Sequence, residues 1–220
     1  MSFHIGRRAL PFIAAVATTL GANALIAQTA FEGVLTMKLS GVGSSAPQTI
    51  KYYVRNGVLR MEMEGKEGGK GYTITDPRKQ VTYMVVPDQR MYMEMPVDPK
   101  AAERIRKSEP IITRTGRTET IAGHKCEHWI IKAEAEESDV CVAKGLGKFF
   151  GMGGGRQWEP AWISKLGPDF FPLRYAKVGQ SQATLEVTRI DKRSLDASLF
   201  QPPAGFRKMA IPTGGRPGKP

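Results

Sequence analysis

The chain is poor in the side chains from which most catalytic and metal sites are built. Its 220 residues include only three histidines and two cysteines, and one of these histidines, His4, lies close to the N-terminus. Beyond the first 27 residues, no apolar run approaches the roughly 20 residues that a membrane-spanning helix needs. We therefore expect a protein that is not an enzyme, has no cofactor or metal, and does not span a membrane.

The N-terminal residues have the three-part pattern of a secretory signal peptide. A basic start is followed by an apolar run and then by small residues. We predict cleavage after Ala27, with Ala24 as the alternative, so that residues 1–27 are removed. The pair Arg7-Arg8 leaves both general and twin-arginine export open. Because no cysteine follows the apolar run, we expect a periplasmic protein that is not lipidated.

Positive charge is in excess, with a formal net charge of +11. The lysines and arginines are scattered over predicted strands and turns, and no nucleic-acid-binding motif is present. We therefore exclude nucleic acid as a partner. A peripheral contact with an anionic membrane surface is compatible with this charge.

Hydrophobic alternation predicts antiparallel strands through most of the chain after residue 27. Residues 31–39 alternate between apolar and polar side chains, and Asn56-Gly57 separates two alternating runs, which is typical of a hairpin with a type I′ turn. Turn sequences then recur about every ten residues, as in an antiparallel meander. The predicted strands after this hairpin are 72–75, 80–86, 91–95, 170–178 and 183–190.

The two cysteines lie in residues 118–145, which we interpret as two strands joined by an acidic turn at Ala133–Glu134. Placing Cys126 directly opposite Cys141 also places His128 opposite Asp139. A directly opposed antiparallel pair has the Cα spacing that a disulfide needs, and an oxidising compartment preserves the bond. The sequence therefore predicts a Cys126–Cys141 disulfide.

The same hairpin is not expected to bind a metal. His124, Cys126, His128 and Cys141 formally make a two-cysteine, two-histidine set. However, four residues of straight strand would separate the two histidine Cα atoms by roughly 13 Å. We expect a structural disulfide flanked by surface histidines.

Three segments are predicted to depart from the sheet. Residues 98–107 begin with Asp-Pro and are expected to form a short covering helix. The glycine-broken residues 144–166 are interpreted as a helical insertion, and residues 195–200 as one helical turn. The basic Pro/Gly tail, residues 207–220, is expected to be disordered. Residues 28–206 then make a single domain.

Taken together, these segments resemble a known family. The segments that carry the resemblance are, in order, an exported N-terminus, FEGVLTMKL, YYVRNGVLRMEM, ITDPRKQVTYMVVPDQRMYMEM, GHKCEHW and LFQPPAGFRKM. This order resembles that of bacterial envelope proteins of the domain-of-unknown-function family 4412. That group is similar to periplasmic lipoprotein carriers and receptors of the LolA/LolB type. The resemblance implies a mainly β fold, a strongly curved and incompletely closed antiparallel sheet (a half-barrel) with short covering helices. It also implies an apolar cavity for acyl chains and no catalytic residue.

The resemblance and the methionine pattern lead to a binding hypothesis. The ligand would be an apolar small molecule or a lipid or lipoprotein acyl chain, with residues 144–166 as a lid, because flexible thioethers adapt to varied apolar ligands. The predicted cavity wall is Leu35, Met37, Leu59, Met61, Met63, Met91 and Met93. Two alternatives stay open: Cu(I) binding by Met91, Met93 and Met95, and an envelope structural or interaction module with a basic surface.

Overall fold

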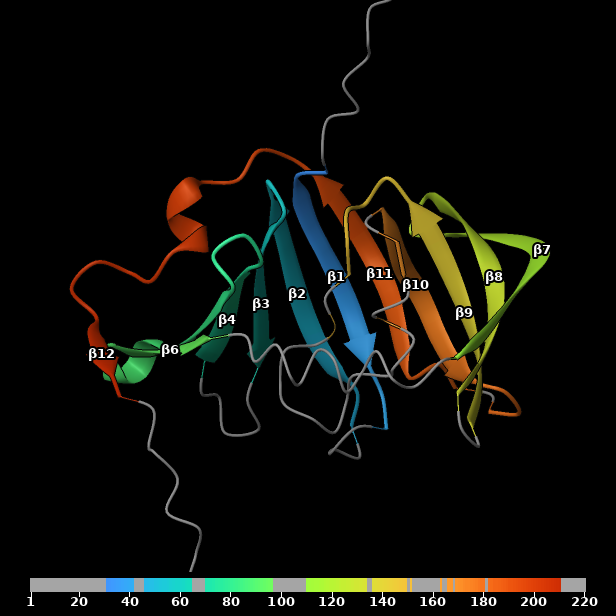
Figure 1. The fold of residues 1–220 in the computed structure, drawn as a ribbon, viewed down its shortest axis with the longest axis horizontal. Helices are drawn as coiled ribbons and strands as arrows, with labels where there is room; N and C mark the ends of the chain where they lie inside the picture. Colours follow the sequence, from blue (N-terminus) through green and yellow to red (C-terminus); the bar gives the residue numbers. More distant parts are fainter. Residues whose placement is uncertain are drawn as a thin grey trace, which may run out of the picture.

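The protein is a single open β-sheet of twelve strands (Figure 1). The computed structural model describes residues 31–41, 46–64, 70–96, 110–133, 136–149, 169–180 and 182–210, together with 151, 163, 166 and 167. The strands are β1 (Gly33–Leu39), β2 (Gln48–Arg55), β3 (Val58–Glu64), β4 (Lys70–Asp76), β5 (Val81–Val86), β6 (Met91–Pro96), β7 (Ile111–Ile121), β8 (His124–Ala133), β9 (Glu136–Lys144), β10 (Phe170–Lys177), β11 (Leu185–Lys192) and β12 (Arg207–Met209). The predicted mainly β, incompletely closed fold is confirmed.

The strand order shows how the sheet is assembled: it runs β12-β6-β5-β4-β3-β2-β1-β11-β10-β9-β8-β7. Two antiparallel meanders, β2 to β6 and β7 to β11, lie on either side of the first strand. β1 pairs antiparallel with β2 on one side and with β11 on the other. β12 adds a short parallel strand beside β6. Figure 1 shows β12 and β7 at opposite ends of the curved sheet.

Short 3-10 helices occur at two places where the sequence predicted a turn. η1 (Pro87–Gln89) connects β5 to β6, and η3 (Ala197–Phe200) follows β11. The Asp196 side chain accepts a hydrogen bond from the Ser198 amide and so caps η3. Among the residues that the structure describes, no helix has the length and hydrophobicity needed to cross a membrane.

The predicted type I′ hairpin is confirmed at β2 and β3. Asn56 and Gly57 have φ values of 50° and 74°, both in the left-handed region that this turn requires. Val54 then pairs with Leu59, and Tyr52 with Met61, so one face of each strand points to the same side of the sheet.

We expect Gly57→Ala to lower the free energy of unfolding by about 1–2 kcal/mol, because a Cβ makes the left-handed conformation unfavourable. A Cβ built at Gly57 meets nothing within 4 Å, so the loss would come from the backbone alone. Urea denaturation would measure it, with Gly57→Asn as the control that tolerates positive φ. If the alanine variant were as stable as the parent protein, the left-handed conformation at residue 57 would not carry the expected cost.

Three sequence predictions are wrong in the cysteine region. A single strand was predicted from residue 118 to the acidic turn, but residues 111–121 form a separate strand, β7, and a turn at Ala122 and Gly123 leads into β8. His128, not Cys126, lies directly opposite Cys141, and Cys126 is opposite Ala143. The disulfide therefore joins a diagonal pair, with the two Cα atoms 5.3 Å apart. Ala133 pairs with Glu136, so it is the last residue of β8 and not part of the turn.

Other segments also differ from expectation. Arg207–Met209 form β12, so the predicted disorder of the tail is wrong for these three residues. Within the predicted insertion, Lys144 ends β9 and residues 145–149 are not helical. Most of the rest of that insertion, the predicted signal peptide, the predicted helix 98–107 and residues 211–220 lie outside the described residues.

The main core lies where β1, β2 and β10 meet the segment after β9. The rings of Tyr52, Phe149 and Phe171 contact one another, with centroid separations of 5.8, 5.5 and 5.1 Å. Leu146, Ile163 and Leu166 belong to the same buried cluster. A second, smaller core of Val58, Ile74 and Val85 is packed against Phe200 and Phe206 from the C-terminal segment.

Candidate binding face and the charged cluster at the disulfide

The described methionines all lie on one face of the sheet. Residues paired across neighbouring strands point to the same side, and side chains alternate along each strand. One row of paired residues crosses seven strands: Leu35, Tyr52, Met61, Thr73, Met84, Met93 and Met209. The eight methionines that the structure describes all lie on this side of the sheet: Met37, Met61, Met63, Met84, Met91, Met93, Met95 and Met209. We call this side the methionine face.

Burial decreases along the methionine face from the centre of the sheet towards its β12 edge. Leu35 and Met37 are fully buried, and Leu59 and Met61 are nearly so. Met63 is 38% exposed, while Met84, Met91, Met93, Met95 and Met209 are half-buried. Four of the seven predicted wall residues thus belong to the core, and Met63, Met91 and Met93 lie at the accessible end. That any of the seven contacts a ligand stays a prediction.

Two methionines of this face were missed by the sequence reasoning. Met209 was assigned to the disordered tail, and Met84 lies in a strand that is apolar on both sides. If the predicted turn at residues 87–90 joins two antiparallel strands, Met84 lies directly opposite Met93, as the structure shows. The sequence therefore contained enough information to place Met84 on this face. No comparable signal places the C-terminal strand beside β6, because that pairing joins distant parts of the chain.

A guanidinium group lies at the edge of the methionine face. Arg207 Nη2 is 3.1 Å from the Met91 sulfur, and the Arg207 amide donates to the Arg90 carbonyl. On the opposite face of the same strands, Lys208 Nζ donates to Glu94 at 2.6 Å. The accessible end of the methionine face therefore has a positive charge beside its thioethers.

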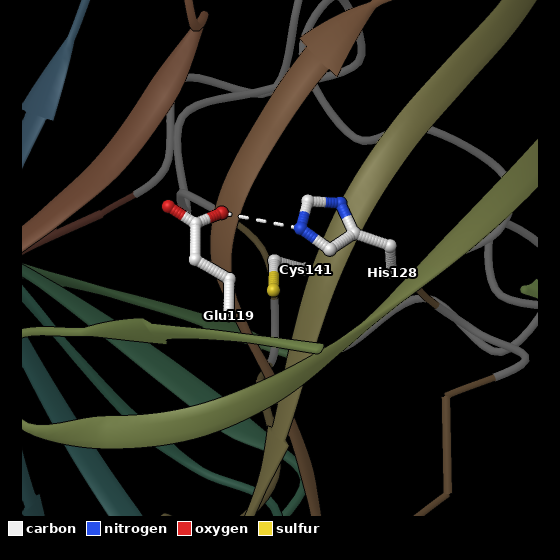
Figure 2. Close-up of side chains that lie close together, drawn as sticks. All are labelled: Glu119, His128 and Cys141. Atoms are coloured by element: carbon white, nitrogen blue, oxygen red, sulfur yellow. Dashed lines mark hydrogen bonds and ion pairs between the residues drawn. The ribbon is translucent and has the colours of Figure 1, made fainter. Parts of the chain in front are cut away.

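The disulfide is surrounded by ionisable side chains from four strands. His128 is only 8% exposed; its Nδ1 lies 2.7 Å from Asp139 Oδ1, and its Nε2 lies 3.1 Å from Glu119 Oε2. Arg174 Nη1 donates to the same Glu119 oxygen at 2.8 Å, and Arg117 forms an ion pair with Asp139. Figure 2 shows Glu119 and Cys141 close to the His128 ring.

The β7–β8–β9 register explains why these groups meet. Glu119 lies opposite Cys126 in the β7–β8 pair, and His128 lies opposite Cys141 in the β8–β9 pair. His128 is therefore a buried member of a polar cluster, and its predicted surface location is wrong. His124 lies apart, with its Nδ1 3.2 Å from the Ala122 carbonyl. Sequence reasoning missed Glu119 because β7 was not recognised as the partner of β8.

The protein is mainly β, with an open and largely antiparallel sheet and a disulfide in one meander. The family described as "Domain of unknown function (DUF4412)" matches residues 31–206, and the chain belongs to this family. No curated protein matches the chain.

MucB, described in "Crystal structure of MucB in complex with MucA(peri)", is among the solved structures that share a distant likeness with this chain. The two chains are 12% identical with a TM-score of 0.41, and the match covers 82% of this chain. The chain spans little more than half of that MucB chain, with 56% of it covered.

Proposed function

We propose that the protein is a non-catalytic, periplasmic binding protein that holds an apolar ligand, such as a lipid or lipoprotein acyl chain, on the methionine face. The observation that carries the proposal is the continuity of this face. It extends from a fully buried core at β1 to β3 to half-exposed thioethers on β5, β6 and β12. A ligand bound at the accessible end would continue the protein's own core.

The chemistry of the accessible end suits a flexible apolar ligand. Methionine side chains are unbranched and polarizable, so they adapt to ligands of different shape. Each methylene group buried by binding contributes about 0.8 kcal/mol. Arg207 beside Met91 would favour a ligand with an anionic head group.

The proposed compartment and lid rest on separate observations. A disulfide persists in an oxidising compartment, which agrees with the predicted signal peptide 1–27. Four described residues of the proposed lid 144–166 are buried in the core that contains Tyr52 of the methionine face. They are Leu146, Phe149, Ile163 and Leu166. The described residues of the proposed lid therefore pack at the buried end of the methionine face.

Cu(I) binding is the second candidate, favoured by one specific observation. Met84, Met93 and Met209 lie on three adjacent strands in a single row of paired residues. Adjacent strands are about 4.8 Å apart, and methionine side chains are long enough for neighbouring sulfur atoms to converge. Thioether sulfur is a soft ligand that selects Cu(I).

Native mass spectrometry of the protein purified from its envelope fraction without reductant would distinguish these candidates. We expect an adduct in the lipid mass range, with a more than tenfold loss of affinity in Met93→Glu, since a charge at this site would be desolvated by the ligand. In the matched control, Met84, Met93 and Met209 are all replaced by leucine, which keeps the apolar surface but removes three sulfurs. An apolar ligand should be retained there.

The other outcomes decide against the proposal. A copper adduct that disappears in the triple leucine variant would establish the Cu(I) candidate instead. A bare chain that takes up neither added fatty acid or phospholipid nor added Cu(I) would overturn both candidates and favour the interaction module instead. Circular dichroism of each variant would confirm that the sheet is intact.

A further inference from the structure

Four side chains at the disulfide combine the residue types and the positions of a zinc site. We propose that the reduced protein binds one Zn²⁺ through Cys126, Cys141, His128 and Glu119, and that the disulfide closes this site in the oxidised protein. The inference is independent of the methionine face, because it rests on the β7, β8 and β9 cluster alone.

The strand register brings the four residues together. Cys126 and His128 are two residues apart on β8 and therefore point to the same side. Glu119 of β7 is paired with Cys126, and Cys141 of β9 is paired with His128. The proposed ligands thus occupy adjacent positions on three neighbouring strands. This differs from the set that includes His124, which is too distant along β8 to join them.

The donor atoms are already close. One carboxylate oxygen of Glu119, one ring nitrogen of His128 and the Cys141 sulfur all lie within 4.8 Å of one another. Figure 2 shows the three side chains grouped together. In tetrahedral zinc sites, with bonds of about 2.0–2.3 Å, donor atoms are about 3.3–3.8 Å apart. Since Cys126 Sγ is bonded to Cys141 Sγ, it would lie beside the same three donors after reduction. Only side-chain adjustments are needed.

The orientation of His128 matches that of a metal ligand. Its Nδ1 lies 2.7 Å from Asp139 Oδ1 and 3.0 Å from Arg117 Nη2. With zinc bound, a proton on Nδ1 donated to Asp139 would leave the Nε2 lone pair directed at the Glu119 side, where the metal would be. Zinc-binding histidines characteristically donate their other ring proton to a carboxylate or carbonyl, which fixes the tautomer and the ring orientation.

The local charges also favour a divalent cation in the reduced state. Glu119 is paired with Arg174, and Asp139 with Arg117, so the carboxylates of the oxidised cluster are already balanced. Two thiolates would add two uncompensated negative charges, which Zn²⁺ would neutralise. Thiolate and imidazole donors select zinc over calcium or magnesium, which prefer oxygen ligands.

The redox step is a thiol–disulfide exchange with an external dithiol. One thiolate of the dithiol attacks a cystine sulfur and forms a mixed disulfide, which the second thiolate then resolves. The dithiol is oxidised to its own disulfide, and the Cys126–Cys141 bond is reduced by two electrons and two protons to two thiols. Zinc binding releases the two thiol protons to solvent.

The test compares zinc uptake by oxidised and reduced protein. The chain is reduced with dithiothreitol, desalted under argon and titrated with Zn²⁺ against a chromophoric chelator. We expect one Zn²⁺ per reduced chain and none per oxidised chain. His128→Gln should weaken binding by at least about tenfold. The matched control, His124→Gln on the same strand, should leave the affinity unchanged.

A second variant removes the need for reductant. Cys126→Ser cannot form the disulfide but retains Cys141, His128 and Glu119, and Co²⁺ bound there should show sulfur-to-metal charge-transfer absorption. Absence of this absorption, absence of zinc uptake by the reduced chain, or equal uptake by the two histidine variants would overturn the proposal. If reduction unfolds the sheet, Zn²⁺ should restore its circular dichroism signal, and failure to do so would equally overturn it.

Discussion

Phe171→Ala is expected to lower the free energy of unfolding by about 3–5 kcal/mol, the range for truncating a buried aromatic side chain. Phe171 is fully buried, and its ring lies 5.5 Å from that of Tyr52 and 5.1 Å from that of Phe149. It thus connects β10, β2 and the segment after β9. Alanine would remove these contacts and leave a cavity among side chains held by three different parts of the chain.

Urea unfolding followed by circular dichroism would measure this loss. Phe171→Leu should cost less, because leucine fills more of the space. Val178→Ala is the control for a non-aromatic site, since Val178 is 53% exposed, and its effect should stay within about 0.5 kcal/mol. A loss below about 1 kcal/mol in Phe171→Ala would show that the three rings are not a tightly packed unit.

Removing the disulfide with Cys126→Ala and Cys141→Ala together is expected to destabilise the protein by about 3 kcal/mol. The two cysteines are 15 residues apart, and a cross-link of this length restricts the unfolded chain by that amount in the chain-entropy model. Both side chains are buried, so alanine also removes sulfur from a packed environment. The measurement is urea unfolding without reductant and with a metal chelator present.

Dithiothreitol provides the control for this second prediction. It should destabilise the parent protein by an amount similar to the double substitution, and it should not affect the double variant. An unchanged unfolding midpoint in the double variant would show that the bond does not constrain the unfolded chain. A large effect of reductant on the variant itself would point to a cause other than the disulfide.

The strands of the sheet could be predicted from sequence wherever local rules determine them. Asn56-Gly57 specifies its turn because both residues tolerate positive φ, and the alternation on either side specifies the faces. The register around Cys141 could not be predicted in this way. Moving its partner from Cys126 to His128 shifts the pairing by two residues, and such a shift leaves every side chain on the same face. Hydrophobic patterning does not distinguish the two registers.

The candidate sites were only partly predictable for the same reason. Seven residues of the methionine face could be assigned by alternation within local strands and hairpins, but their different degrees of burial depend on what packs against them. Met209 and Glu119 required non-local pairings, β12 with β6 and β7 with β8. The sequence of β7, rich in threonine and arginine, lacks the apolar alternation that reveals a strand, because its side chains are largely exposed.

The central position of β1 has a consequence for how the protein folds. Each meander consists of strands that are neighbours in sequence, so its contacts close short loops. The seam between β1 and β11 joins Leu39 to Leu185, which are 185 − 39 = 146 residues apart. Closing so long a loop costs chain entropy before the contacts between β1 and β11 can form, and such long-range pairing is slow. Because β1 pairs with β2 across a short loop, with Leu39 opposite Gln48, only its seam with β11 is expected to form late. The species that precede it are expected to be two half-sheets, β1 to β6 and β7 to β11.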